Sequence, residues 1–141
     1  MDKSKIQTLI QKKYLEFQEE VSMSTYAVIA IKRPNGTINL ARLLQNGNPE
    51  KAGIILCNCY KTTEQVEALL ALGEILNLGT TPEKSTPQNS GLPGYVRHEG
   101  MLVRNFDMTH FLYLFDNGKW RCFDRFGKAD WICLEEYVEN K

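Results

Sequence analysis

Two short stretches of the chain combine arginine, aromatic and amide side chains, which are the groups that proteins use to hold nucleotides. The first contains Tyr95 and Arg97, and the second contains Arg104, Asn105 and Phe106. Arginine binds a phosphate through two parallel hydrogen bonds, an aromatic ring stacks on a base, and an asparagine amide pairs with an adenine edge. The residue types leave an alternative equally open, in which the aromatic rings are core and the arginines form a solvated face.

A hairpin is strongly predicted after these stretches. Residues 110–115 and 119–126 are rich in aromatic side chains, and Asn117-Gly118 between them is the favoured two-residue turn. Side chains alternate along a strand, so one face of the second strand should carry a cationic and aromatic strip. The strip consists of Arg121, Phe123 and Arg125. It is a further candidate for phosphate binding.

A third candidate lies at the start of a predicted helix. Asn46-Gly47 accepts φ > 0 and lets the chain reverse, Asn48 is placed as an N-cap, and Pro49 suits the first helical position. A helix N-terminus presents unpaired N–H groups, so it could contact an anion together with Asn46, with Lys51 and Arg42 as the residues that could add positive charge. Simple capping by the asparagines is the alternative, and we treat this site as secondary.

The stretch from residue 46 to residue 79 is predicted to contain two short helices. The second begins at Thr62 or Thr63, either of which can cap it, and Gly73 and Gly79 are the expected stops. Its apolar residues are Val66, Leu69, Leu70 and Leu72, with Ile75 and Leu76 following.

The remaining stretches complete the expected elements. Residues 24–32 and 37–44 are predicted strands joined by a turn at 34–36. Residues 80–94 contain three prolines and two glycines, which predicts a flexible loop without regular structure. A short C-terminal element is expected to become helical after Cys133.

The first residues predict a further helix. Residues 3–21 place apolar side chains near helical spacing, with lysine and glutamate on the opposite face. Packing of this amphipathic helix on the chain's own sheet is the preferred interpretation, and contact with a second subunit is the alternative. Its apolar residues are Ile6, Leu9, Ile10, Tyr14, Phe17 and Val21.

Together these elements predict an α+β fold. Antiparallel β-hairpins should form a sheet packed against two or three short helices, with the N-terminal amphipathic helix added. The length of 141 residues fits a single domain. Residues 1–22 would be a helical extension, and residues 23–141 would be the core with its flexible loop at 80–94.

The charge distribution narrows the class of partner. The formal net charge is zero, which argues against binding to a nucleic-acid polymer. Segments 22–49 and 95–128 carry net charges of +3 and +2, whereas segment 50–94 carries −2. Two basic hairpins on a neutral chain favour a small anionic ligand. The sequence has no apolar run near ~18 residues and no signal-peptide pattern, so we expect no membrane partner and a cytoplasmic location.

Catalytic and metal-binding motifs are not apparent. The two histidines, His98 and His110, stand in no hydrolase or metalloprotease motif, and adjacent His98 and Glu99 would point to opposite faces of a strand. The four cysteines are expected to be buried free thiols. We therefore expect no cofactor, no metal and no enzymatic activity, with a Cys–His pair assembled in space as the alternative.

The order and spacing of several motifs resemble a family of small phage and prophage proteins. The resemblance spans roughly residues 26–125. Its parts are Asn46-Gly47-Asn48-Pro49 with Gly53, Tyr60, Val66, Leu72-Gly73-Glu74, Tyr95-Val96-Arg97, and Tyr113 to Trp120. Leu44, Gln45, Asn46 and Asn48 stand where the family has His, Trp, Asp and Tyr, so a ligand is expected chiefly on residues 95–125. By this resemblance, the helix predicted before Met23 is an addition to the part of the chain that the family shares.

The characterised relatives that this family resembles are anti-Thoeris sponge proteins of phages. The resemblance implies a non-catalytic scavenger of cyclic ADP-ribose isomers, or of cyclic oligonucleotides from CBASS defence, in the cytoplasm of the infected host. It implies that Tyr95 or Phe106 stacks on adenine and that Asn105 contacts the adenine edge. It also implies that the diphosphate is held by Arg97, Arg104, Arg121 and Arg125, and the added N-terminal helix favours a homo-oligomer.

Two other functions compete with the scavenger. The chain could inhibit a host enzyme through a protein surface, and would then co-purify with that enzyme regardless of small nucleotides. It could also be a small nucleotide hydrolase that uses His98 or His110.

Overall fold

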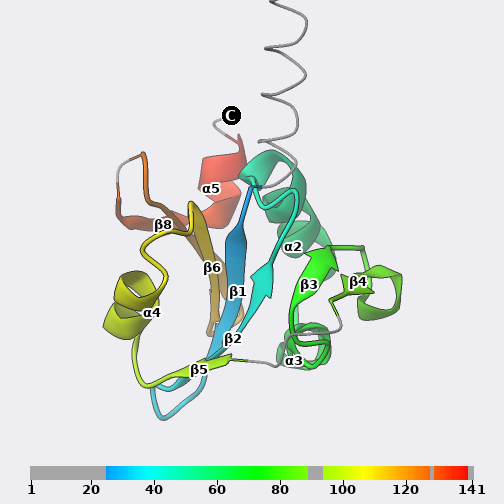
Figure 1. Cartoon of the computed structure of the whole chain (residues 1–141), viewed down its shortest axis with the longest axis horizontal. Coiled ribbons are helices and arrows are strands. Elements are labelled where there is room, and N and C mark those ends of the chain that lie inside the picture. Colours follow the sequence, from blue (N-terminus) through cyan, green and yellow to red (C-terminus); the bar gives the residue numbers. More distant parts are fainter. Residues whose placement is uncertain (1–24, 89–93, 128, 140–141) are drawn as a thin grey trace, which may run out of the picture.

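The computed structural model describes residues 25–88, 94–127 and 129–139. The helix predicted for residues 3–21, and with it the extension 1–22, lies outside the described residues. Within them the fold is α+β, as the sequence predicts: one mixed sheet carries helices on both of its faces (Figure 1). No helix in this part of the chain has the length and apolar character needed to cross a lipid bilayer.

Two antiparallel hairpins form the centre of the sheet. The first joins β1 (Ala27–Lys32) to β2 (Ile38–Leu43), and the second joins β6 (Phe111–Asp116) to β7 (Lys119–Asp124). The turn of the second hairpin has positive φ at both central residues, 53° at Asn117 and 79° at Gly118, as an Asn-Gly turn predicts. β1 pairs with β6 in parallel, so both hairpin tips lie at the same end of the sheet.

Short strands extend this centre on both sides. The order is β4-β3-β2-β1-β6-β7-β8, and β5 (Gly94–Val96) also pairs with β2. β8 (Trp131–Cys133) pairs antiparallel with β7, and β3 (Ile75–Asn77) pairs in parallel with β2. The sequence pattern placed Ile75 and Leu76 after a helix but did not reveal that they form a strand.

The loop predicted for residues 80–94 contains regular structure, which corrects that prediction. Pro82–Lys84 form the 3₁₀ turn η2, capped by the Thr81 side chain, and Thr86–Pro87 form β4 beside β3. Proline is compatible with the first turn of a helix and with a short edge strand, so the prolines here do not exclude either element.

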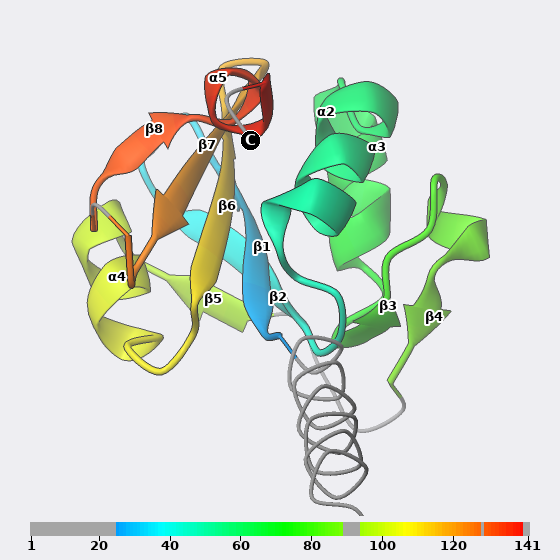
Figure 2. The same cartoon turned by 90° about the horizontal axis from the view of Figure 1, so that it is seen from above.

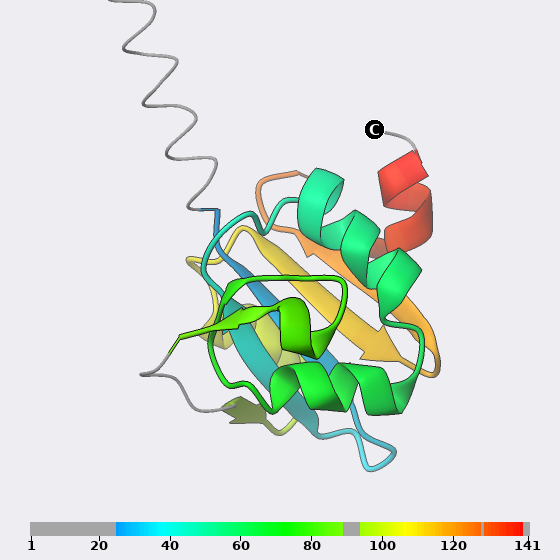
Figure 3. The ribbon, with the colours of Figure 1, turned by 90° about the vertical axis from the view of Figure 1, so that its right-hand side faces the viewer.

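Three helices cover one face of the sheet (Figures 2 and 3). A π-helical turn, η1 (Pro49–Gly53), opens α2 (Ile54–Cys59), and α3 (Thr63–Leu70) and α5 (Leu134–Glu139) follow. Of the two predicted caps for α3, Thr62 is the one used, and it forms a capping box: Thr62 Oγ1 accepts from the Gln65 N–H at 3.2 Å, and Gln65 Oε1 accepts from the Thr62 N–H at 3.1 Å.

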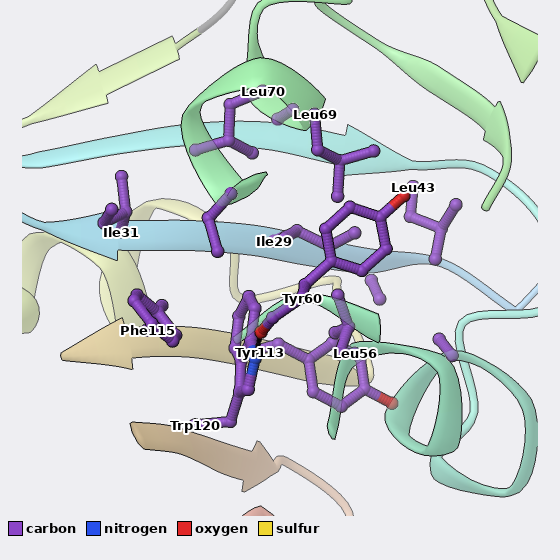
Figure 4. Packing of buried hydrophobic residues seen from close by; sticks show 14 of the residues in the cluster. Ile29, Ile31, Leu43, Leu56, Tyr60, Leu69, Leu70, Tyr113, Phe115 and Trp120 are labelled. Atoms are coloured by element: carbon purple, nitrogen blue, oxygen red, sulfur yellow. Dashed lines mark hydrogen bonds between the residues drawn. The ribbon is translucent and has the colours of Figure 1, made fainter. Parts of the chain in front are cut away.

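The core under these helices is the larger of two. Figure 4 shows Tyr60 and Tyr113 gathered with Leu56 between the helices and the strands. The polar atoms of its aromatic rings are satisfied, since Tyr113 Oη donates to the Gly47 carbonyl at 2.6 Å and Trp120 Nε1 donates to the Tyr60 carbonyl at 2.8 Å. Burial raises the pKa of Tyr113 well above its usual range.

The opposite face of the sheet is covered by a helix that the sequence pattern did not assign. α4 (Glu99–Asn105) buries Leu102 completely and packs Phe106 against the sheet (Figure 2). The sheet residues of this second core are Val28, Ala30, Ile38, Leu40, Val96, Leu112, Leu114 and Phe123. The face that carries the predicted cationic strip is therefore covered rather than open.

The prediction that the Asn48 side chain caps the following helix is wrong. Asn48 does precede the helix that starts at Pro49, but its side chain makes no cap hydrogen bond. Its Nδ2 instead donates to Glu50 Oε2 at 2.9 Å.

Candidate functional site

The tips of the two central hairpins enclose a hollow of about 590 Å³ at one end of the sheet. We call it the tip hollow. It is lined by Ile31, Lys32, Arg33, Pro34, Thr63, Phe115, Asp116 and Asn117. Thr63 is the first residue of α3, so the positive end of that helix dipole lies at the hollow, while the capping box pairs the Thr62 and Gln65 N–H groups. Its size falls within the range of small-molecule sites, roughly 300–1,000 Å³.

The two cations of the tip hollow are each held by one carboxylate. Lys32 Nζ lies 2.9 Å from Glu99 Oε1, and Arg33 Nη1 donates to Glu67 Oε1. The Lys32 and Arg33 side chains remain 32% and 36% exposed. Glu99 belongs to α4 and Glu67 to α3, which cover opposite faces of the sheet, so Arg33 is the cation on the same side as Thr63, whereas the Lys32 ammonium lies on the α4 side.

Glu99 joins the tip hollow to α4. It also accepts from Arg121 Nη2 at 2.7 Å, and the same nitrogen lies 3.0 Å from Asp116 Oδ2. The Arg121 guanidinium stands 5.4 Å from the centre of the Trp131 ring. Arg121 and Lys32 beside Glu99 lower the pKa of that carboxyl, although its partial burial opposes the effect. The first residue of α4 is thus fixed to the sheet by two cations.

This arrangement predicts a pH dependence of stability. Because the pKa of Glu99 is lower in the folded protein than in the unfolded chain, its contribution is complete above the unfolded value of 4.5 and is lost as the pH falls through the folded value. We expect Glu99→Gln to reduce the loss of unfolding free energy between about pH 5 and about pH 3, measured by urea unfolding.

Glu83→Gln is the matched control for this prediction. Glu83 is exposed and makes no ion pair among the described residues, so the variant should keep the wild-type pH profile. An unchanged profile in the Glu99 variant would contradict the prediction.

Arg125, Phe123 and Phe106 are used by the fold at the other end of α4. Arg125 Nη2 donates to the carbonyls of Val103 at 2.8 Å and of Phe106 at 3.0 Å. Its Nε donates to the Thr109 carbonyl at 3.0 Å, and Phe123 is only 7% exposed beneath α4. These side chains fix the helix to the sheet, and their polar groups already have partners in the protein.

The four other predicted ligand residues of segment 95–105 are exposed, but they are not gathered on one side. Tyr95, Arg97, Arg104 and Asn105 all reach solvent, and Tyr95 is 59% exposed. Tyr95 pairs with Asn39 across β5 and β2. Register therefore places Tyr95 on the face of the sheet that carries α2 and α3, whereas α4 covers the other face.

The two secondary candidates lie apart from the tip hollow. Arg42 is exposed on β2, and its Nη1 lies 3.5 Å from Glu74 Oε1. Asn46 has a φ of 55°, as predicted, and its Oδ1 accepts from Lys51 Nζ at 3.2 Å. Asn46 borders a separate hollow of about 390 Å³, whose other lining residues include Lys51, Ile54, Ile55 and Leu78.

The histidines and cysteines have identifiable structural contacts. His98 is the N-cap of α4, where its Nδ1 accepts from the Met101 N–H at 3.3 Å. His110 Nε2 lies 3.0 Å from Asp124 Oδ1, and Tyr137 Oη donates to the other Asp124 oxygen at 2.7 Å. The four cysteines are free thiols, of which Cys122 alone is fully buried. In the described ranges no group of three or more His, Cys, Asp or Glu side chains is placed to hold a metal.

Lys32, Arg33 and Asn117 line the tip hollow, but they were not among the ligand-binding residues predicted from the sequence. The basic excess of segment 22–49 pointed to the first hairpin, and the Asn-Gly turn located the second tip. What the pattern could not reveal was the parallel pairing of β1 with β6, which brings the two tips together.

In comparisons with known proteins, no protein-family model, no curated protein and no solved structure matches this chain.

Proposed function

We propose that this protein is a non-catalytic scavenger that binds a small cyclic nucleotide, such as a cyclic ADP-ribose isomer, in the tip hollow. By sequestering that signal it would inhibit bacterial anti-phage defence in the cytoplasm of the host. The observation that carries the proposal is the convergence of the two basic hairpins on one hollow lined by Lys32, Arg33 and the N-terminus of α3.

The chemistry of the hollow suits a phosphorylated nucleotide. Arg33 provides charge-assisted donors for phosphate oxygens on the α3 side of the hollow, Lys32 adds positive charge from the α4 side, and the positive end of the α3 dipole lies at Thr63. Asn117 supplies an amide that can pair with a base or a ribose hydroxyl. Asp116 is an acceptor for a ribose hydroxyl, although its charge disfavours a second phosphate beside it.

Arg97 is the most plausible contributor from the segment that the resemblance favours. It is exposed, and it lies two residues before Glu99, which contacts Lys32 of the tip hollow. Among the described residues Arg97 has no carboxylate partner within ion-pair distance, so its guanidinium is available to a phosphate. Arg104 and Asn105 follow on the outer side of α4, where a larger ligand would reach them.

The scaffold around the hollow suits slow release. Lys32 and Arg33 are positioned by Glu99 and Glu67 before any ligand arrives. A site whose side chains are already ordered loses less conformational entropy on binding, and affinity differences between related complexes lie mostly in the dissociation rate.

Isothermal titration calorimetry with cyclic ADP-ribose isomers tests the proposal. We expect binding, and we expect heat denaturation of the complex to return the ligand unchanged in mass and chromatographic retention. Lys32→Gln combined with Arg33→Gln should weaken binding by at least about a hundredfold, since each charge-assisted bond contributes about 1.5–3 kcal/mol. Lys84→Gln, at an exposed lysine of η2 outside the hollow, is the control and should bind like the wild type.

The competing functions predict different results, in the recovered ligand for a hydrolase and in co-purification with a host protein for a protein-directed inhibitor. A hydrolase would return an altered nucleotide, and that activity would be lost on substitution of His98 or His110. A protein-directed inhibitor would retain a host protein whether or not nucleotide is added. Absence of binding by a folded wild-type protein to any isomer or cyclic oligonucleotide tested would overturn the proposal.

A further inference from the structure

A second hollow, of about 390 Å³, lies between α2, α5 and the β6–β7 turn. We call it the α2–α5 hollow. Figure 3 shows α5 next to α2, with the β6–β7 turn lower down at the same edge of the molecule. Its lining residues differ from those of the tip hollow, so the inference below does not depend on the proposed nucleotide function.

The α2–α5 hollow is lined by charges of both signs that do not pair with one another. Lys61 and Lys119 contribute cations from the residue after Tyr60 and from the start of β7. Glu135 and Glu139 contribute carboxylates, both from α5 and four residues apart, so they share one side of that helix. In the part of the chain that the structure describes, none of the four lies within 4.0 Å of an opposite charge.

The two aromatic side chains beneath the α2–α5 hollow have their polar atoms satisfied within the protein. Trp120 Nε1 donates to the Tyr60 carbonyl, and Tyr60 Oη donates to the Gly79 carbonyl at 2.9 Å. Because Tyr60 is 0% exposed and Trp120 only 6% exposed, the apolar surface open to a ligand comes mainly from Ile54, which is 40% exposed and also lines the hollow. Val138 adds a further apolar contact from α5.

The side nearest α5 favours a positive charge. Burial and the nearby Glu135 carboxylate raise the pKa of the Cys57 thiol to about 11, so this thiol is uncharged at neutral pH. Glu135 and Cys57 line the same hollow, and no cation of the described residues lies within 4.0 Å of the Glu135 carboxylate.

We infer that the α2–α5 hollow binds a small zwitterion whose anionic and cationic ends are separated by a short apolar chain. The anionic end would meet Lys61 and Lys119, the cationic end would meet Glu135 and Glu139, and the apolar chain would lie on Ile54 and Val138, close to the edge of Trp120. A molecule with one charge satisfies only half of the site. The concave shape favours a small molecule over a second copy of the chain, whose surface would have to insert a side chain.

The probe for this inference is 6-aminohexanoic acid, compared with hexanoate and hexylamine. The chain contains two tryptophans, and only Trp120 lines the hollow. We expect 6-aminohexanoic acid to shift the Trp120 indole N–H signal in a ¹H–¹⁵N spectrum and to leave the Trp131 signal unchanged. Hexanoate and hexylamine should bind roughly fivefold more weakly or worse, since each forms only one of the two charge contacts.

Two double variants and one control complete the experiment. Lys61→Gln with Lys119→Gln should abolish the preference for 6-aminohexanoic acid over hexylamine, and Glu135→Gln with Glu139→Gln should abolish its preference over hexanoate. Glu83→Gln with Lys84→Gln, outside the hollow, should keep both preferences. Equal shifts from all three probes, no shift from any, or a Trp120 shift that follows protein concentration through self-association would overturn the inference.

Discussion

Arg125→Met is expected to lower the free energy of unfolding by about 3 kcal/mol, because it removes charge-assisted bonds and leaves carbonyls unpaired. Arg125 donates to the carbonyls of Val103, Phe106 and Thr109, which lie in α4 and in the segment just after it. The last carbonyls of a helix have no partner within the helix, so this guanidinium provides what the helix end lacks. Methionine keeps most of the apolar stem and isolates the loss of the donors.

The measurement is urea unfolding, with native-state hydrogen exchange to locate the change. Amides of α4 should lose protection more than those of β1 or β6, because the helix loses its attachment at one end. Arg104→Met is the matched control, since Arg104 is exposed on α4 and its Nε bonds only to the Gly100 carbonyl of the same helix at 3.3 Å. It should change stability by no more than about 0.5 kcal/mol. Equal effects of the two substitutions would contradict the role assigned to Arg125.

The elements with strong local signals could be predicted from the sequence. Asn117-Gly118 accepts the positive φ angles of a tight hairpin, and Thr62 with Gln65 forms a capping box, so both features are written in adjacent residues. The helix after Cys133 was also predicted, whereas the strand β8 before it was not. Each of the predicted features depends on interactions within a few residues.

Features that depend on distant residues could not be predicted. α4 has seven residues and only Leu102 is fully buried, which is too short a pattern to distinguish a helix from a loop. Its position depends on Arg121 and Arg125, which are more than fifteen residues away from the groups they bind on it. The chain's local pattern cannot distinguish an arginine that binds a ligand from one that binds a carbonyl.

The same limit explains why the candidate site moved from residues 95–125 to the tip hollow. The strip of Arg121, Phe123 and Arg125 does share one face of β7, as alternation predicts, but that face is covered by α4. The cations that line the tip hollow, Lys32 and Arg33, come from the β1–β2 hairpin. The parallel pairing of β1 with β6, strands about eighty residues apart in the sequence, determines which charged residues lie close together. No pattern within a few neighbouring residues predicts that pairing.

Gly47→Ala is expected to lower the free energy of unfolding by about 2–3 kcal/mol, because the added methyl group has no space. A Cβ at this position would stand 2.7 Å from the Ala27 Cβ and 2.8 Å from the Thr25 carbonyl oxygen. The backbone cannot easily move away, since the Gly47 N–H donates to Thr25 at 3.0 Å and the Gly47 carbonyl accepts from Tyr113. Close approach of two segments therefore requires glycine here, whereas the positive φ of the turn belongs to Asn46.

Gly100→Ala gives this prediction a control with the opposite expected sign. Gly100 lies in α4, and a Cβ there would meet only the His98 ring, at 3.2 Å, which has to shift by only a few tenths of an ångström and can do so while it keeps its cap bond to the Met101 N–H. Alanine in a helix is favoured over glycine by up to about 1 kcal/mol, so the variant should be as stable as the wild type or slightly more stable. Thermal and urea unfolding of both variants measure the difference. Equal stability of Gly47→Ala and Gly100→Ala would contradict the close packing of Gly47 against Thr25, Ala27 and Tyr113.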